Sequence, residues 1–170
     1  MPAGVFPVPK DVRTNRSFTI VKGVDRMIRT PVVLTDPALN VDLGEFLAID
    51  AAGLAVKATA GAIITAPLQG ARASWTLYRQ GDTTNGQADA VGTGQVDLLS
   101  APYQAQTQVF DTGATYLPGA PLVVIHNGGS PGLGFLAPLD PATADAEQLA
   151  AVVGTVVVVP TNGILHYEAK

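Results

Sequence analysis

The side chains able to do chemistry are few in this chain, and their spacing does not assemble a catalytic or metal site. His126 and His166 stand far apart, outside any cluster with the ligand spacing of a zinc site, and the chain has no cysteine. No Gly-x-Ser-x-Gly motif is present, and no serine has a general base beside it in the sequence. We therefore predict a protein that is not an enzyme, with no metal, no cofactor and no catalytic residue.

The glycine-rich and acidic segments fit turns better than ligand loops. Neither 92–94 nor 128–132 is followed by Lys-Ser/Thr or by a helix that could offer its N-terminus to phosphate. The acidic residues between Asp82 and Asp111 are too widely spaced for a calcium loop, which takes its oxygen ligands from alternate positions. We interpret these segments as exposed turns.

Trp75 and Tyr78 form the one pattern that could hold a ligand by stacking. Two rings so close in sequence could offer a platform to a sugar, although a lone tryptophan in a β domain more often fills the interior. We favour the core for Trp75. A carbohydrate-binding module that uses both rings stays open as an alternative function.

Charge is scarce and unevenly placed. Only 14% of the residues are charged, against about 25% in typical soluble domains, and the net charge is −4. A surface short of charge favours assembly, and the acidic balance argues against nucleic acid as a partner. The longest apolar runs, 122–125 and 152–159, fall short of the roughly 20 residues that span a bilayer, so we expect no membrane contact.

Six of the ten basic residues lie between Lys10 and Arg29, which gives the chain two electrically different ends. Such a basic segment could orient the protein on an acidic protein surface through arginine–carboxylate pairs. It could equally consist of strand-edge charges that discourage edge-to-edge pairing. The residues support both interpretations.

The elements predicted from the pattern are mostly strands. Prolines at 2, 7 and 9 exclude a helix and make 1–17 an extended arm, ahead of a single β-rich domain over 18–170. Segment 80–100, with four glycines, reads as a loop excursion from the core. A short helix is expected over 142–151, with Asp140 as its N-cap. The expected strands are 17–22, 30–35, 46–49, 54–58, 62–66, 73–79, 103–110, 121–126 and 152–159.

We therefore predict an all-β fold, a β-sandwich or small β-barrel with an extended N-terminal arm and one short helix. One pattern occurs twice within it: a glycine, an apolar run and a glycine turn, at 44–54 and again at 119–129. The β-branched run 152–159 suits a strand buried on both faces.

The arm, the two strand-and-turn units and the ending 152–165 together resemble the decoration, or cement, proteins of tailed bacteriophage capsids. The resemblance implies a β-rich protein on the outside of the virion head, commonly a trimer, that bridges major capsid protein subunits and has no active site. No basic and apolar signal segment opens the chain, so we expect assembly in the host cytoplasm. The arm would carry the capsid contacts: Val5, Phe6, Val8, Lys10, Arg13 and Arg16.

A second virion role remains open beside this one. A tail or head-fibre component would use the same β architecture but bind a host surface or a tail partner. Location on the particle separates the two roles, because a cement protein covers the head.

Overall fold

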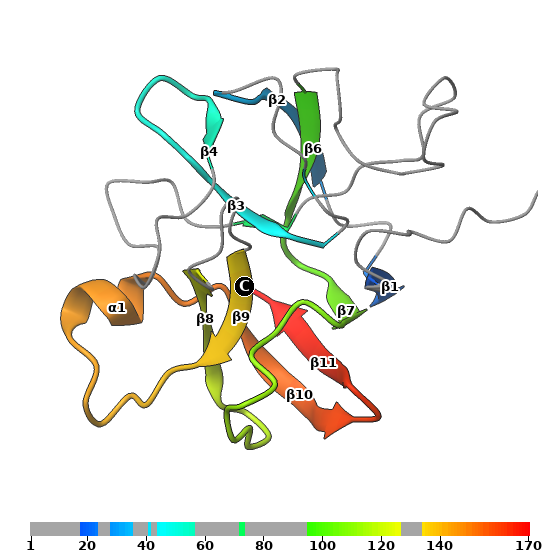
Figure 1. Ribbon diagram of the computed structural model, residues 1–170, viewed down its shortest axis with the longest axis vertical. Coiled ribbons are helices and arrows are strands. Elements are labelled where there is room, and N and C mark those ends of the chain that lie inside the picture. Colours follow the sequence, from blue (N-terminus) through cyan, green and yellow to red (C-terminus); the bar gives the residue numbers. More distant parts are fainter. Residues whose placement is uncertain are drawn as a thin grey trace, which may run out of the picture.

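The computed structural model describes residues 18–23, 28–35, 41, 44–56, 72–73, 95–126 and 134–170, and it confirms the predicted all-β fold (Figure 1). Its sheets are antiparallel, and one short helix, α1 (Ala146–Ala150), accompanies them. The predicted arm, the strand at 62–66 and most of the strand at 73–79 lie outside the described residues. Within the described ranges the strands are β1 (Phe18–Lys22), β2 (Ile28–Val33), β3 (Phe46–Ile49), β4 (Ala55–Val56), β5 (Arg72–Ala73), β6 (Gln95–Ser100), β7 (Gln104–Thr107), β8 (Pro121–His126), β9 (Gly134–Pro138), β10 (Gly154–Thr161) and β11 (Ile164–Ala169).

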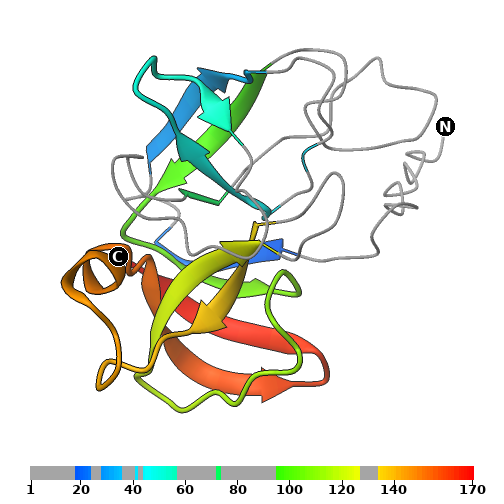
Figure 2. The same ribbon diagram turned by 60° about the vertical axis from the view of Figure 1, so that its left-hand side comes forward.

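The largest sheet has the strand order β1-β7-β11-β10-β8-β9 and curls back on itself (Figure 2). The chain that follows β7 reaches the free edge of β9, where Asp111 donates its N–H to the Leu136 carbonyl at 2.8 Å. Leu136 in turn donates to the Val109 carbonyl at 3.1 Å. The buried Thr107 hydroxyl accepts from the Val109 N–H at 2.9 Å, which bends the chain away from β11. These bonds close the sheet into a small barrel.

Every second side chain of β11 points into this barrel. Leu165, Tyr167 and Ala169 are buried, whereas the residues between them face outward, as the two-residue period of a strand requires. Tyr167 packs against Phe46 with ring centroids 6.2 Å apart and meets Tyr103 edge to face at 6.1 Å. Edge-to-face contacts are favoured because the positive ring edge meets a negative ring face.

A second, smaller hydrophobic cluster lies above the barrel, between the β2-β6 ribbon and the β4-β3-β5 sheet. β3 joins the two clusters, because Phe46 and Ala48 point into the barrel cluster while Leu47 and Ile49 point into the second. All four residues are buried. The run therefore lacks the polar alternation of a strand with one solvated face.

Both predicted strand-and-turn units begin as expected, with a glycine at positive φ two residues before the strand. Gly44 precedes β3 and Gly119 precedes β8, each with φ +79°. After β3, the Asp50 carboxylate accepts from the N–H groups of Ala52 and Leu54, and Gly53 takes the left-handed conformation. The turn that follows β8 lies outside the described residues.

The helix starts later than predicted. Asp145, rather than Asp140, is its N-cap: the Asp145 carboxylate accepts from the Gln148 N–H at 2.7 Å, and the Gln148 side chain accepts from the Asp145 N–H at 3.1 Å. This capping box needs Glu or Gln three residues after the cap, and Asp140 has Thr143 there. Asp140 caps a separate turn by accepting from the Ala142 N–H.

Two further predictions are wrong in part. Residues 95–100 belong to no loop excursion, because they form β6, whose Val96, Leu98 and Leu99 are buried; residues 80–94 lie outside the described residues. The strand predicted at 152–159 is β10, and it is not buried on both faces. Its second half runs beyond the strand that flanks it, so Val158 and Val159 are exposed.

The join between β3 and the barrel can be tested at Gly134. A methyl group there would overlap the Phe46 carbonyl oxygen, and backbone atoms cannot move aside cheaply. We expect Gly134→Ala to lower the free energy of unfolding by about 1–3 kcal/mol, measured by urea denaturation. Gly113→Ala is the matched control, because its new methyl group would lie 3.3 Å from the movable Asp111 carboxylate. Equal effects of the two substitutions would contradict the close approach of β3 to β9.

Candidate functional site

Most of the residues that the sequence singles out for binding lie outside the described part of the chain. This holds for the arm, with its capsid-contact candidates Val5 to Arg16, and for Trp75 and Tyr78. Both histidines lie within strands: His126 ends β8 and His166 is in the middle of β11. β8 and β11 flank β10 on opposite sides, so the two histidines lie on strands that do not pair with each other.

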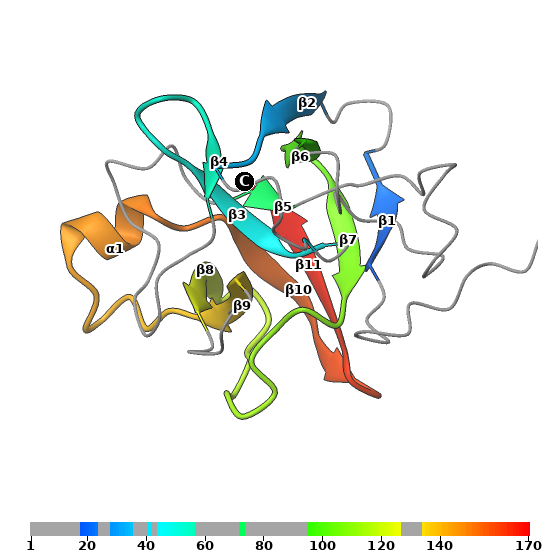
Figure 3. The ribbon, with the colours of Figure 1, turned by 45° about the horizontal axis from the view of Figure 1, so that its top comes forward.

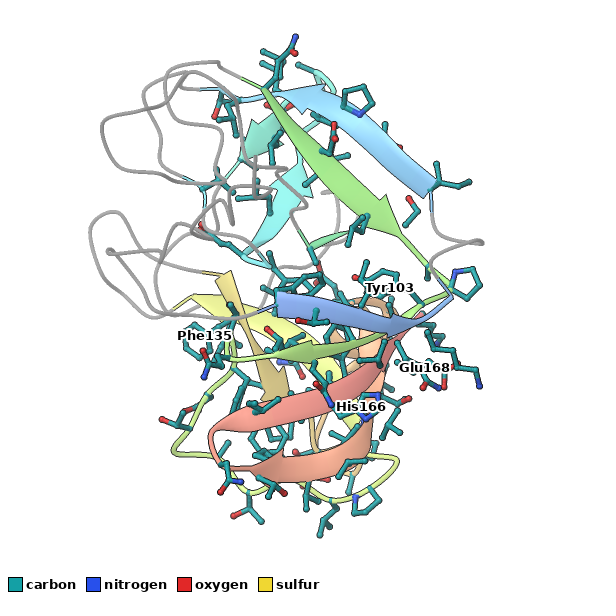
Figure 4. All side chains as sticks on the ribbon, turned by 90° about the vertical axis from the view of Figure 1, so that its right-hand side faces the viewer. Tyr103, Phe135, His166 and Glu168 are labelled. Carbon is teal, nitrogen blue, oxygen red and sulfur yellow. The ribbon has the colours of Figure 1, made fainter. Side chains whose placement is uncertain are left out.

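The structure instead brings together a polar surface on the outside of the barrel, which we name the outer polar face. It arises from alternation, since the neighbours of each buried residue in β1, β7 and β11 must point outward. Antiparallel register aligns these neighbours into rows across the three strands (Figure 4). The face consists of Thr19, Lys22, Gln104, Gln106, His166 and Glu168.

One row of this face carries its charges. Lys22 on β1 is opposite Gln104 on β7, which is opposite Glu168 on β11. The Gln104 side-chain amide donates to a Glu168 carboxylate oxygen at 3.4 Å. Lys22 and Glu168 are exposed, so a cation and a carboxylate are both available to a partner from this row.

The other row is centred on an imidazole. Thr19, Gln106 and His166 are aligned across β1, β7 and β11, and Val158 of β10 continues the row. His166 is half-buried, and its Nε2 atom is buried without a hydrogen-bond partner among the described residues. The row supplies hydroxyl, amide and imidazole groups, which can donate and accept hydrogen bonds.

The outer polar face is continuous with the predicted arm through the chain itself. β1 is an outermost strand of the sheet order, and its first residue, Phe18, directly follows the arm over 1–17. Any partner held by the arm close to its end therefore comes near Thr19 and Lys22.

A cavity of about 290 Å³ lies at the end of the barrel that meets β3 and β6. Most of its lining residues are apolar, with Phe46, Leu99 and Tyr103 as the large side chains and Ser100 as a hydroxyl, but polar atoms form more of its exposed wall than apolar atoms do. The volume is at the lower limit of the roughly 300–1,000 Å³ of small-molecule sites. Among the described residues, no group of three or more His, Asp or Glu side chains could hold a metal ion.

The two phenols beside this cavity are held in the neutral form. Burial raises the pKa of Tyr103 to about 12, although its hydrogen bond to Tyr167 opposes the shift. The pKa of Tyr167 is raised well above 10 by burial and, secondarily, by the nearby Tyr103. The two hydroxyl oxygens are 3.2 Å apart and satisfy each other inside the barrel.

The outer polar face was not among the sites expected from the sequence, although β11 carries a signal for it. Residues 164–169 read Ile-Leu-His-Tyr-Glu-Ala, in which His166 and Glu168 alternate with apolar residues. That alternation predicts a strand with one buried face and one solvent-exposed face. It does not predict which strands lie beside it, and the rows depend on those neighbours.

Comparison with known proteins adds no identification: no protein-family model, curated protein or solved structure matches the chain. Within the described part of the chain, no helix is long and apolar enough to cross a membrane.

The pKa values of the buried phenols predict a loss of stability in alkali. An unfolded tyrosine ionises near pH 10, whereas folded Tyr103 keeps its proton to about pH 12. Between these values the folded state binds more protons, so the free energy of unfolding falls as the pH rises. The stabilisation is fully present below pH 10. We expect urea denaturation between pH 10 and 12 to show this fall, and Tyr103→Phe to make it shallower; an unchanged slope would contradict the assignment.

Proposed function

We propose that the protein is a structural virion protein that binds the outer surface of a phage capsid and bridges major capsid protein subunits. The observation that carries the proposal is the continuity of the outer polar face with the N-terminal arm through β1. An arm and an adjoining sheet face would provide two contacts on one chain. Such a chain can bridge a boundary between two subunits.

The chemistry of the two parts is complementary in this role. The arm offers the apolar Val5, Phe6 and Val8, followed by the cations Arg13 and Arg16. The face offers the Glu168 carboxylate, which accepts hydrogen bonds, and side-chain amides, which both donate and accept them. Apolar anchors inside a polar rim are the usual anatomy of a protein–protein contact.

Repetition supplies the strength that one such contact lacks. Surface ion pairs and hydrogen bonds each contribute only about 0–1 kcal/mol. On a shell, every copy meets the same surface, and two linked contacts per copy raise avidity by effective concentration. A modest face is therefore sufficient for stable decoration of a lattice.

The arm is the first part to test. We expect deletion of residues 1–17 to leave a folded domain that no longer cosediments with heads lacking the protein, because the apolar anchors are lost. Circular dichroism checks the fold, and electron microscopy of heads with the full chain gives its location. Cosedimentation of the truncated protein at full strength would contradict the role of the arm; full-chain density on the tail would favour the tail or head-fibre alternative.

The outer polar face is tested by charge reversal at one residue. We expect Glu168→Lys to weaken head binding by about tenfold, because it removes an available carboxylate and places a second cation in the row of Lys22. Glu147→Lys on α1 is the matched control, since Glu147 is also exposed and the charge change is the same. Binding constants would come from titration of labelled protein onto heads. Equal weakening by both substitutions would indicate a non-specific charge effect and would contradict the proposed face.

A further inference from the structure

The far end of the β10-β11 hairpin is a strand edge without a neighbour. β10 pairs with β8 only at Gly154 and Thr155, and two hydrogen bonds then tie Val156 to Gly119 and Ala120. Beyond Val156, β11 is the one strand that pairs with β10 in the described part of the chain. The hairpin turn at Asn162 and Gly163 lies at the periphery of the molecule, away from β2 and β4 (Figure 3).

The side chains of this end are apolar and exposed. Val158 is 48% exposed, Val159 37% and Leu117 66%. The Gly119 N–H donates to the Val156 carbonyl and the Val156 N–H donates to the Ala120 carbonyl, so the two segments run side by side in opposite directions. The Ala120 N–H also donates to the Leu117 carbonyl at 3.0 Å, so the chain turns between these two residues. We name residues 157–159 the valine edge.

The valine edge also lacks the charges that protect exposed strands. None of the residues in 112–125 and 151–165 is Asp, Glu, Lys or Arg. Exposed edges normally carry lysine, an inward charge or proline, because an open β-branched edge pairs with other chains. In β10 the protecting features are Pro160, near the hairpin turn, and the two shifts of its register against β11, between Val156 and Val158 and between Val158 and Thr161. We expect an exposed apolar edge of this kind to be covered by a partner when the protein functions.

We propose that the valine edge is covered by the valine edge of a second copy of this chain, with the two β10 strands antiparallel about a two-fold axis. An antiparallel strand pair is self-complementary, so a single patch serves both partners. Each copy carries a net charge of −4, and copies repel one another except where charge is absent. The uncharged edge is therefore a region where two copies approach at low electrostatic cost. A charged partner would find no counter-charge there.

This contact is separate from capsid binding and from the three-fold assembly that the resemblance implies. The valine edge adjoins the outer polar face at Val158, which continues the His166 row, but its unpaired backbone lies on β10, whereas the outer polar face is centred on β1, β7 and β11. A two-fold pair would present two such faces on one particle. The inference can therefore fail while the proposed function holds, and the reverse is also true.

Sedimentation equilibrium of the full chain tests the pairing. We expect the wild-type protein to be a dimer at micromolar concentration. Val158→Lys should raise the dimer dissociation constant by about 100-fold or more, because each dimer would bury two like charges. Ala150→Lys, which adds the same charge at an exposed position of α1, should leave it unchanged. Circular dichroism and thermal melting establish that both variants are folded.

Cysteine substitution gives a second test that does not depend on the lysine variant folding. The chain has no cysteine, so a single new thiol reports only its own copy-to-copy contact. Of Val157→Cys, Val158→Cys and Val159→Cys, the variant nearest the axis should form a disulfide dimer on oxidation, because the facing Cβ atoms approach to bonding range. Ala150→Cys should not. A monomeric or trimeric wild type, a dimeric Val158→Lys protein, or no difference among the cysteine variants would overturn the proposal.

Discussion

The burial of β3 on both faces is the constraint on which the rest of the structure depends. Phe46 and Ala48 belong to the barrel cluster and Leu47 and Ile49 to the second cluster, so four consecutive residues connect two hydrophobic cores. Interiors are packed at crystal-like density, and neither cluster can shift without disturbing the other. The glycine at 134, which lets β3 approach β9, serves the same junction. The two packed clusters therefore hold the strands that carry the outer surfaces in fixed positions.

The sequence predicts the elements that its local pattern specifies. β3, the turn at Asp50 to Gly53 and β8 follow from apolar runs bounded by glycine, and all three are present. The sequence does not predict β6, because its short apolar run follows a glycine-rich segment that is typical of a loop. Its place in the fold depends on pairing with β2. The sequence does not predict that the second half of β10 is exposed, because a run of valines can be flanked either by another strand or by solvent. Rows such as Lys22–Gln104–Glu168 depend on strand order, which local pattern does not contain.

A common arrangement underlies the two surfaces for which we propose partners. Alternation in β11 sends Tyr167 into the barrel and leaves His166 and Glu168 outside, so the same strand builds the core and displays polar groups. β10 contributes Val156 to the core and, past the end of its pairing with β8, presents Val158 and Val159 to solvent. Recognition in this account comes from strand faces and edges. The cavity beside Tyr103 has no part in it.

Amide hydrogen exchange, compared between the free and the head-bound protein, tests this account most directly because it reports which backbone becomes covered. We predict slower exchange on binding in residues 1–22 and across β7 and β11, with β3 equally protected in both states. Protection confined to residues 99–101, 103, 169 and 170, which line the cavity, would place the contact elsewhere and contradict this prediction.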